Sequence, residues 1–127
     1  MAQGRVLVAD DSKVFRALVV EALREKGWDV VEAANGRDAI EHALTNRPQL
    51  LILDALMPLV SGFDVILRLR EKAPDYNPKV FLVTGVYKGR RWHTEGRQTY
   101  QVQEYLEKPI ETDELLKFVA RHFPQMA

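Results

Sequence analysis

The 127-residue chain contains no cysteine, has no net formal charge and carries no long apolar run. Without cysteine it has neither disulfides nor thiolate metal ligands, which is compatible with a reducing compartment. Eighteen basic residues balance eighteen acidic ones, so the overall charge gives no support for binding nucleic acid or an anionic membrane. No stretch approaches the roughly 20 apolar residues of a membrane-spanning helix, and no signal peptide is recognisable. We therefore expect a cytoplasmic protein that forms one domain over residues 1–127.

Short apolar runs alternate with segments of helical periodicity. The runs that predict strands cover residues 5–9, 28–33, 50–53, 80–83 and 104–106. Helices are predicted over residues 12–26, 37–46 and about 62–73, and from Thr112 or its neighbour onward. The first helix is predicted from apolar residues at helical spacing, namely Val14, Phe15, Leu18, Val19, Ala22 and Leu23. Strands joined by helical crossovers predict an α/β fold with a five-stranded parallel sheet covered on both faces.

Polar residues follow four of these strands directly. Asp10 and Asp11 end the first run, Asp54 the third, Thr84 the fourth and Lys108 the fifth. The carboxyl ends of parallel strands share one edge of a sheet, where ligands collect in α/β proteins. We therefore expect these five side chains to lie together.

The residue types at this edge predict phosphoryl chemistry. Three neighbouring carboxylates need a cation, and carboxylate oxygens suit a hard divalent ion such as Mg²⁺. The lysine ammonium and the threonine hydroxyl add donors that lack an acceptor. A phosphoryl group would satisfy both donors, and a carboxylate can be the nucleophile that receives it. Asp54 is the residue we expect to carry the phosphate.

With these motifs the chain resembles the receiver domains of two-component response regulators. The resemblance covers Val6 to Phe123 and depends on Asp10-Asp11, Asp54 with Met57-Pro58 and Gly62, Thr84, and Lys108-Pro109. It implies a flavodoxin-like, doubly wound (βα)₅ fold with the strand order 2-1-3-4-5, which we carry over from the family.

The resemblance also implies a role for each site residue. Asp54 would be the phosphoacceptor, loaded by a histidine kinase, a phosphotransfer protein or a small phosphodonor. The Mg²⁺ site would comprise Asp11 as a direct ligand, Asp10 acting through water, Asp54, and the backbone carbonyl of Leu56. Lys108 would pair with the phosphoryl oxygens and precede a cis peptide bond to Pro109.

The output implied by the resemblance is a change of surface. Thr84 would swing toward the phosphoryl group, and Tyr105 would act as the aromatic switch that turns inward with it. The fourth helix, fifth strand and fifth helix would then present an altered face to a downstream protein partner or to a second copy of the chain.

Residues 85–103 depart from the family pattern. Three glycines (Gly85, Gly89, Gly96) and poor periodicity predict a short or mobile fourth helix. The segment also carries the exposed-looking aromatics Tyr87, Trp92 and Tyr100. One interpretation is a flexible solvated loop, and the other is a specialised partner face anchored by Trp92. Leu56 and Val86 place apolar groups beside the site, which predicts slow hydrolysis of a phosphoaspartate.

Two alternatives stand beside the phosphorylation switch. A small phosphoester hydrolase would also use an aspartate nucleophile, but it needs a second acid, and Leu56 stands two residues after Asp54. A receiver-like docking module would keep the fold and signal without phosphate. The sequence names neither the cognate kinase nor the output.

Overall fold

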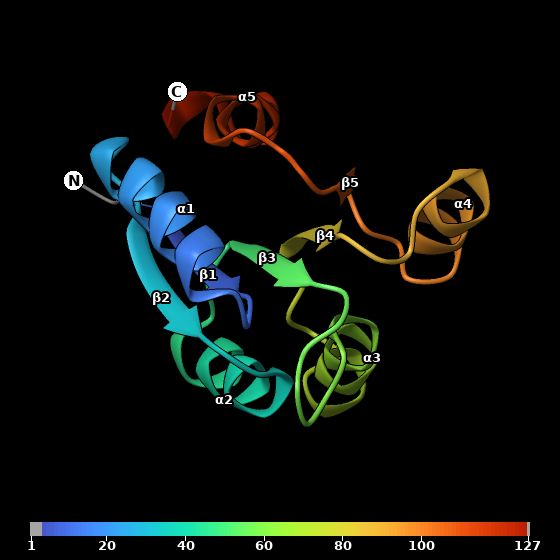
Figure 1. Cartoon of the computed structure of the whole chain (residues 1–127). Coiled ribbons are helices and arrows are strands. Elements are labelled where there is room, and N and C mark those ends of the chain that lie inside the picture. The colour runs from blue at the N-terminus through green and yellow to red at the C-terminus, as the bar shows by residue number, and fades with distance from the viewer. Residues whose placement is uncertain (1–3, 127) are drawn as a thin grey trace.

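The structure, a computed structural model, describes residues 4–126, in which five strands alternate with five α-helices (Figure 1). The strands are β1 (Arg5–Ala9), β2 (Asp29–Ala33), β3 (Leu50–Asp54), β4 (Lys79–Thr84) and β5 (Glu104–Glu107). The helices are α1 (Lys13–Glu25), α2 (Gly36–Asn46), α3 (Gly62–Lys72), α4 (Arg90–Gln98) and α5 (Thr112–His122), followed by the 3-10 helix η1 (Pro124–Met126). The outermost residues of the predicted domain, 1–3 and 127, lie outside the described residues.

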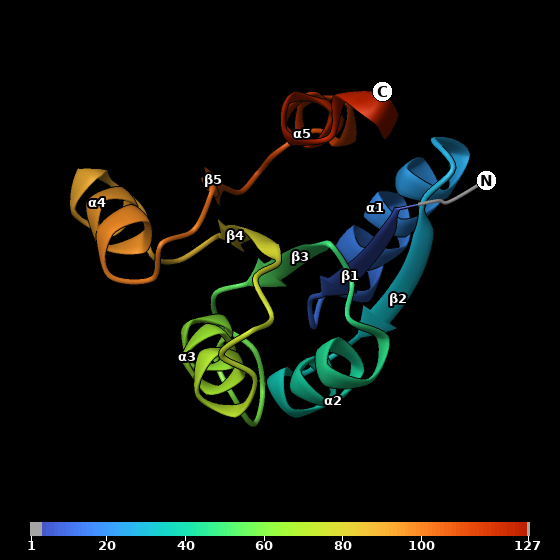
Figure 2. The ribbon, with the colours of Figure 1, turned by 180° about the vertical axis from the view of Figure 1, so that it is seen from behind.

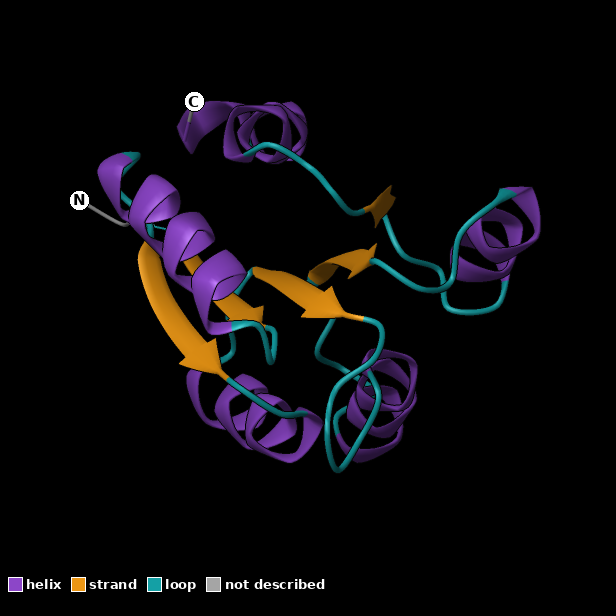
Figure 3. Ribbon diagram, in the orientation of Figure 1, coloured by secondary structure: helices purple, strands orange, loops and turns teal. Residues whose placement is uncertain are grey.

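The five strands form one parallel sheet in the order β2-β1-β3-β4-β5, which confirms the predicted topology. Helices α1 and α5 cover one face and α2 and α3 the other, while α4 lies beside the β5 edge (Figure 2). The secondary-structure view shows each strand leading through a loop into a helix (Figure 3). No helix within residues 4–126 is long and apolar enough to cross a bilayer.

Two apolar cores lie on the two faces of the sheet. The core beneath α1 and α5 includes Val6, Val8, Val20, Leu23, Ile52, Phe81, Leu115 and Val119. The core beneath α2 and α3 includes Leu7, Ala39, Leu51, Phe63, Ile66, Leu69, Leu82 and Tyr105. All five residues of β3 are buried because both faces of this central strand are covered. The sheet is therefore a rigid support for its carboxyl edge.

Some of the apolar residues whose spacing predicts helix α1 are exposed on its surface. Ser12 caps the helix by accepting a hydrogen bond from the Phe15 amide. Val19 and Leu23 are buried as expected, but Val14 is 72% and Leu18 54% exposed. The helical spacing that predicts α1 therefore includes two residues that face solvent. They leave two large apolar side chains exposed on the surface of α1.

The segment 85–103 is ordered around an aromatic cluster that the sequence did not reveal. Helix α4 is the shortest of the five, and it begins after Gly89, whose φ of 102° suits glycine. The rings of Tyr87, Trp92 and Tyr100 surround Phe63 of α3, with centroids 4.7 to 5.9 Å from its ring. These aromatics are half-buried. Trp92 thus packs between α3 and α4 and is half-buried, and its role as an anchor for a partner stays a prediction.

Candidate functional site

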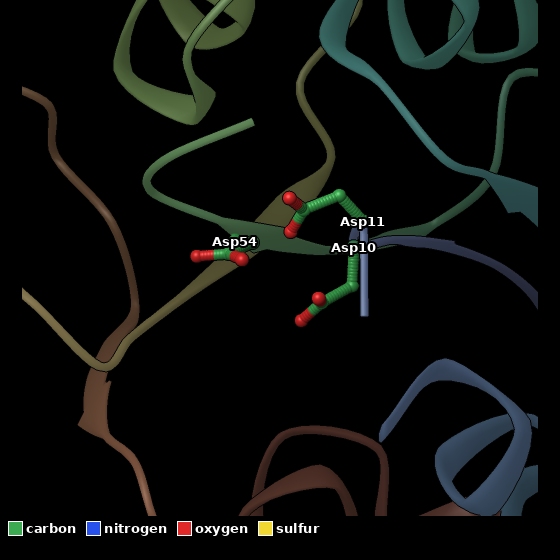
Figure 4. A group of neighbouring side chains, drawn as sticks. All are labelled: Asp10, Asp11 and Asp54. Carbon is green, nitrogen blue, oxygen red and sulfur yellow. The ribbon is translucent and has the colours of Figure 1, made fainter. Parts of the chain in front are cut away.

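The structure brings four of the five predicted edge residues, Asp10, Asp11, Asp54 and Lys108, together around the ends of β1 and β3. Asp10 follows β1 directly, Asp54 is the last residue of β3, and Lys108 follows β5. Asp10, Asp11 and Asp54 each offer a carboxylate oxygen, and these oxygens lie within 4.8 Å of one another (Figure 4). A cleft of about 480 Å³ lies over Asp11, Asp54 and Lys108.

Asp10 is buried and both of its carboxylate oxygens are engaged. Oδ1 accepts a hydrogen bond from the Ser12 amide at 2.8 Å, and Oδ2 accepts one from Lys108 Nζ at 2.8 Å. Arg16 donates to the Asp10 backbone carbonyl at 2.6 Å. Hydrogen bonds to the side chain and to the backbone carbonyl of Asp10 therefore fix the turn from β1 into α1.

Asp54 has fewer partners than Asp10. It is 8% exposed, its Oδ1 accepts from the Leu56 amide at 3.2 Å, and its Oδ2 lies 3.6 Å from Lys108 Nζ. The pKa of Asp54 is raised to about 6, first by burial and then by the charge of Asp10, while Lys108 acts in the opposite direction. A carboxylate in this position is stabilised by any added cation.

The donor set fits a hard divalent ion. Asp10 and Asp54 are buried, while Asp11 is exposed. The group of three carboxylates is therefore open to solvent on the side of Asp11. Oxygen ligands with room for water are what Mg²⁺ prefers. The raised pKa of Asp54 indicates that burial and the neighbouring carboxylates disfavour its charged form more strongly than Lys108 favours it.

The loop between β3 and α3 must turn back sharply beneath the site. A Cβ built on Gly62 would lie 2.2 Å from the Asp54 carbonyl oxygen, so only glycine allows this approach. The Gly62 amide donates to the Ala55 carbonyl at 2.9 Å and closes the loop. Leu59, in the same loop, has a φ of 72° and is 66% exposed.

Thr84 and Tyr105 are joined through the backbone of Tyr87. Thr84 Oγ1 accepts hydrogen bonds from the amides of Val86 at 3.1 Å and Tyr87 at 3.0 Å. The Tyr105 hydroxyl donates to the Tyr87 carbonyl at 2.6 Å, and Tyr105 is 2% exposed. The ring of Tyr105 therefore already lies inward while the Thr84 hydroxyl holds the loop.

Two residues near the site were missed by the sequence reasoning. Phe15 counted only as one apolar position in the spacing of the first helix; in the structure it packs against the core beneath α1 and α5, and its ring centroid lies 4.3 Å from Lys108 Nζ. Gly96 was read as a helix-weakening residue, but it lies against the ring of Tyr105. The only sequence feature that could have pointed to Phe15 is its place as an aromatic residue in the first helical turn after Asp10-Asp11. No sequence feature points to the contact of Gly96.

The fold and the edge residues define a flavodoxin-like α/β protein with an acidic, lysine-bearing site. The chain matches the family model of the response regulator receiver domain over residues 6–120, and it belongs to that family. Receiver domains are signalling domains of two-component systems and typically use Mg²⁺. The family assignment expected from the motifs is thereby confirmed.

Individual relatives support the same assignment. The chain is 33% identical over 112 residues to the transcriptional regulatory protein DltR of Streptococcus agalactiae, which covers 88% of this chain and 48% of that protein. It is 27% identical over 124 residues to sporulation initiation phosphotransferase F of Bacillus subtilis, which covers 98% of this chain and 97% of that protein. The signal receiver domain of a putative Luxo repressor protein from Vibrio parahaemolyticus has a TM-score of 0.85 and 30% identity, with 98% and 93% coverage. The chain spans less than half the length of the first curated regulators it matches.

Proposed function

We propose that the chain is a phosphorylation switch in which Asp54 accepts a phosphoryl group. The donor is a histidine kinase, a phosphotransfer protein or a small acyl phosphate. Residues 1–127 act as a single receiver domain in the cytoplasm. The observation that carries the proposal is the cluster of three carboxylates within 4.8 Å, with the Lys108 ammonium beside two of them.

The reaction needs a nucleophile and charge compensation. An Asp54 carboxylate oxygen attacks phosphorus, and the bond from phosphorus to the donor's imidazole nitrogen or acyl oxygen breaks. At neutral pH Asp54 is ionised, because this pH lies above its pKa of about 6. Lys108 approaches the phosphoryl oxygens from the position it holds between Asp10 and Asp54. Asp10, Asp11, Asp54 and the Leu56 carbonyl would hold Mg²⁺, which when bound neutralises charge on the phosphoryl group.

A protein phosphodonor would dock on the apolar surface around the cleft. The exposed residues Val14 and Leu18 lie on α1, and three more exposed apolar residues, Leu56, Leu59 and Val86, lie on the loops after β3 and β4. Exposed apolar groups gathered around a reactive centre favour contact with a partner. The left-handed backbone of Leu59 holds its side chain outward at a cost in strain. We propose that a histidine-bearing partner covers this surface during transfer.

The output runs from Thr84 to the face formed by α4, β5 and α5. If the Thr84 hydroxyl turns toward a phosphoryl group on Asp54, it releases the amides of Val86 and Tyr87. The Tyr87 carbonyl that holds Tyr105 belongs to the same loop. Movement of this loop therefore alters the contact between Tyr105 and α4, and a downstream protein or a second copy of the chain reads the change.

The test is phosphorylation in vitro. Wild type and Asp54→Asn are incubated with acetyl phosphate, with Mg²⁺ or with EDTA, and intact mass is recorded. The proposal predicts one phosphoryl adduct that needs both Mg²⁺ and Asp54. Absence of the adduct under all conditions would contradict it and favour a docking module. Rapid turnover of added phosphoesters with no stable adduct would instead favour a hydrolase.

A further inference from the structure

Lys108 is held by a carboxylate on one side and by an aromatic ring on the other. Its Nζ lies 2.8 Å from Asp10 Oδ2 and 3.6 Å from Asp54 Oδ2. The Phe15 ring, in the first turn of α1, has its centroid 4.3 Å from the same nitrogen. A cation within about 6 Å of a ring centroid is attracted by the negative face of the ring. Phe15 thus contacts the charged atom of Lys108.

The ring differs from the other partners of Lys108 because it is neutral. The first turn of α1 contains no acidic residue, so the helix contributes an aromatic face and no carboxylate to the lysine. A carboxylate there would compete with phosphoryl oxygens for the ammonium. An aromatic face attracts the ammonium while leaving its full positive charge for another anion.

The position of the lysine also matters because its side chain is long and flexible. Four methylene carbons connect the backbone to the ammonium, and fixing the rotatable bonds between them costs conformational entropy. The Lys108 side chain is only 21% exposed. A ring that limits its freedom from the α1 side would keep the ammonium near both carboxylates.

We propose that Phe15 is a positioning residue that holds the Lys108 ammonium by a cation-π contact, so that the lysine can move from Asp10 to a phosphoryl group on Asp54. The inference builds on the proposed function, since it assigns Phe15 a part in the same reaction. Phe15 does not touch the reacting atoms and acts only through Lys108.

The test compares two substitutions of Phe15 with a matched control. Phe15→Leu keeps an apolar side chain but removes the ring, whereas Phe15→Tyr keeps the ring. Phe118→Leu is the control, because Phe118 is another half-buried phenylalanine packed on the core beneath α1 and α5. Nuclear magnetic resonance (NMR) of the Lys108 ε-methylene group reports the ring directly, since protons over an aromatic face are shifted upfield. The rate of phosphoryl adduct formation is measured against acetyl phosphate concentration.

We expect the upfield shift of the Lys108 ε-protons in wild type and Phe15→Tyr, and its loss in Phe15→Leu. The maximal rate of adduct formation should fall about three- to tenfold in Phe15→Leu and stay near wild type in Phe15→Tyr and Phe118→Leu. An unchanged Lys108 signal or an unchanged rate in Phe15→Leu would overturn the proposal, as would an equal loss of rate in Phe15→Tyr. If wild type forms no adduct, the proposed function fails, and the NMR comparison alone decides whether Phe15 positions Lys108.

Discussion

Gly96 of α4 lies directly against the ring of Tyr105. A Cβ built on Gly96 would stand 2.5 Å from Tyr105 Cδ2, closer than real Cβ atoms approach a neighbour. The absence of a side chain at residue 96 is therefore what lets the tyrosine lie inward beneath the helix. Gly96 links the stability of α4 to the position of the proposed switch residue.

A double-mutant cycle on these two residues tests the relationship. Gly96→Ala alone should destabilise the protein by about 1–3 kcal/mol, because the new methyl group overpacks against the ring. In a Tyr105→Ala background the same substitution should stabilise it by up to about 1 kcal/mol, because alanine is a better helix former than glycine. Urea denaturation measures all four proteins. If Gly96→Ala changes the free energy of unfolding equally in both backgrounds, the contact with the Tyr105 ring is not the cause of the destabilisation.

The charge of Asp54 should destabilise the metal-free fold above pH 6. Its pKa is raised from 3.8 to about 6 in the fold, so the folded state binds the proton more tightly than the unfolded state. The resulting penalty is absent well below pH 3.8, where both states are protonated. It grows as pH rises through this window and reaches about 2–3 kcal/mol above pH 6.

Asp54→Asn should remove that penalty. In EDTA at pH 8 the variant should be more stable than wild type by up to this amount, and near pH 3 the difference should nearly vanish. The control is Glu21→Gln, which removes one exposed carboxylate of α1. Denaturation curves that show the same difference at both pH values would contradict the account.

Trp92 should report movement of α4. Its ring lies 5.9 Å from Phe63 and 4.7 Å from Tyr87, at the junction of α3, α4 and the loop after β4. Trp28→Phe removes the other tryptophan, which is buried beside Phe123 in the opposite core. In this variant, phosphorylation verified by intact mass should change the emission of Trp92. Constant emission in the phosphorylated protein would show that the change does not reach α4.

The apolar rim of the cleft should prolong the life of the phosphoaspartate. Leu56 is 48% exposed and lines the cleft together with Val86, so neither side chain can orient a water molecule there. Leu56→Asn adds an amide that can, and one such hydrogen bond predicts about fivefold faster hydrolysis. The decay of the adduct mass after removal of acetyl phosphate measures this rate. Leu59→Asn lies in the same loop outside the cleft lining and should leave the lifetime unchanged; equal effects of both variants would argue against the explanation.

The sheet and its edge were predictable because both follow from local patterns. Apolar runs that stop at Asp10, Asp54 and Thr84 give the strands their ends, and parallel pairing places those ends together. The strand order came from the family resemblance, since alternation of strands and helices does not determine it.

The contacts between elements were not predictable in the same way. Helical spacing identified α1, but it could not decide between neighbouring apolar stripes, and Val14 and Leu18 proved to be exposed. The half-burial of Trp92 depends on Phe63, which lies 29 positions earlier in the chain and shares no local pattern with it. The contact of Phe15 with Lys108 joins opposite ends of the sequence. Such contacts depend on tertiary packing between distant segments, and a local sequence pattern does not show them.

The most direct test of the phosphorylation switch is to locate the phosphoryl group on the chain. Wild-type protein is treated with acetyl phosphate and Mg²⁺, reduced with borohydride to convert an aspartyl phosphate to homoserine, and digested for peptide mass spectrometry. The account predicts homoserine at position 54 alone and none when EDTA replaces Mg²⁺. Homoserine at Asp10 or Asp11, or at no position, would contradict it.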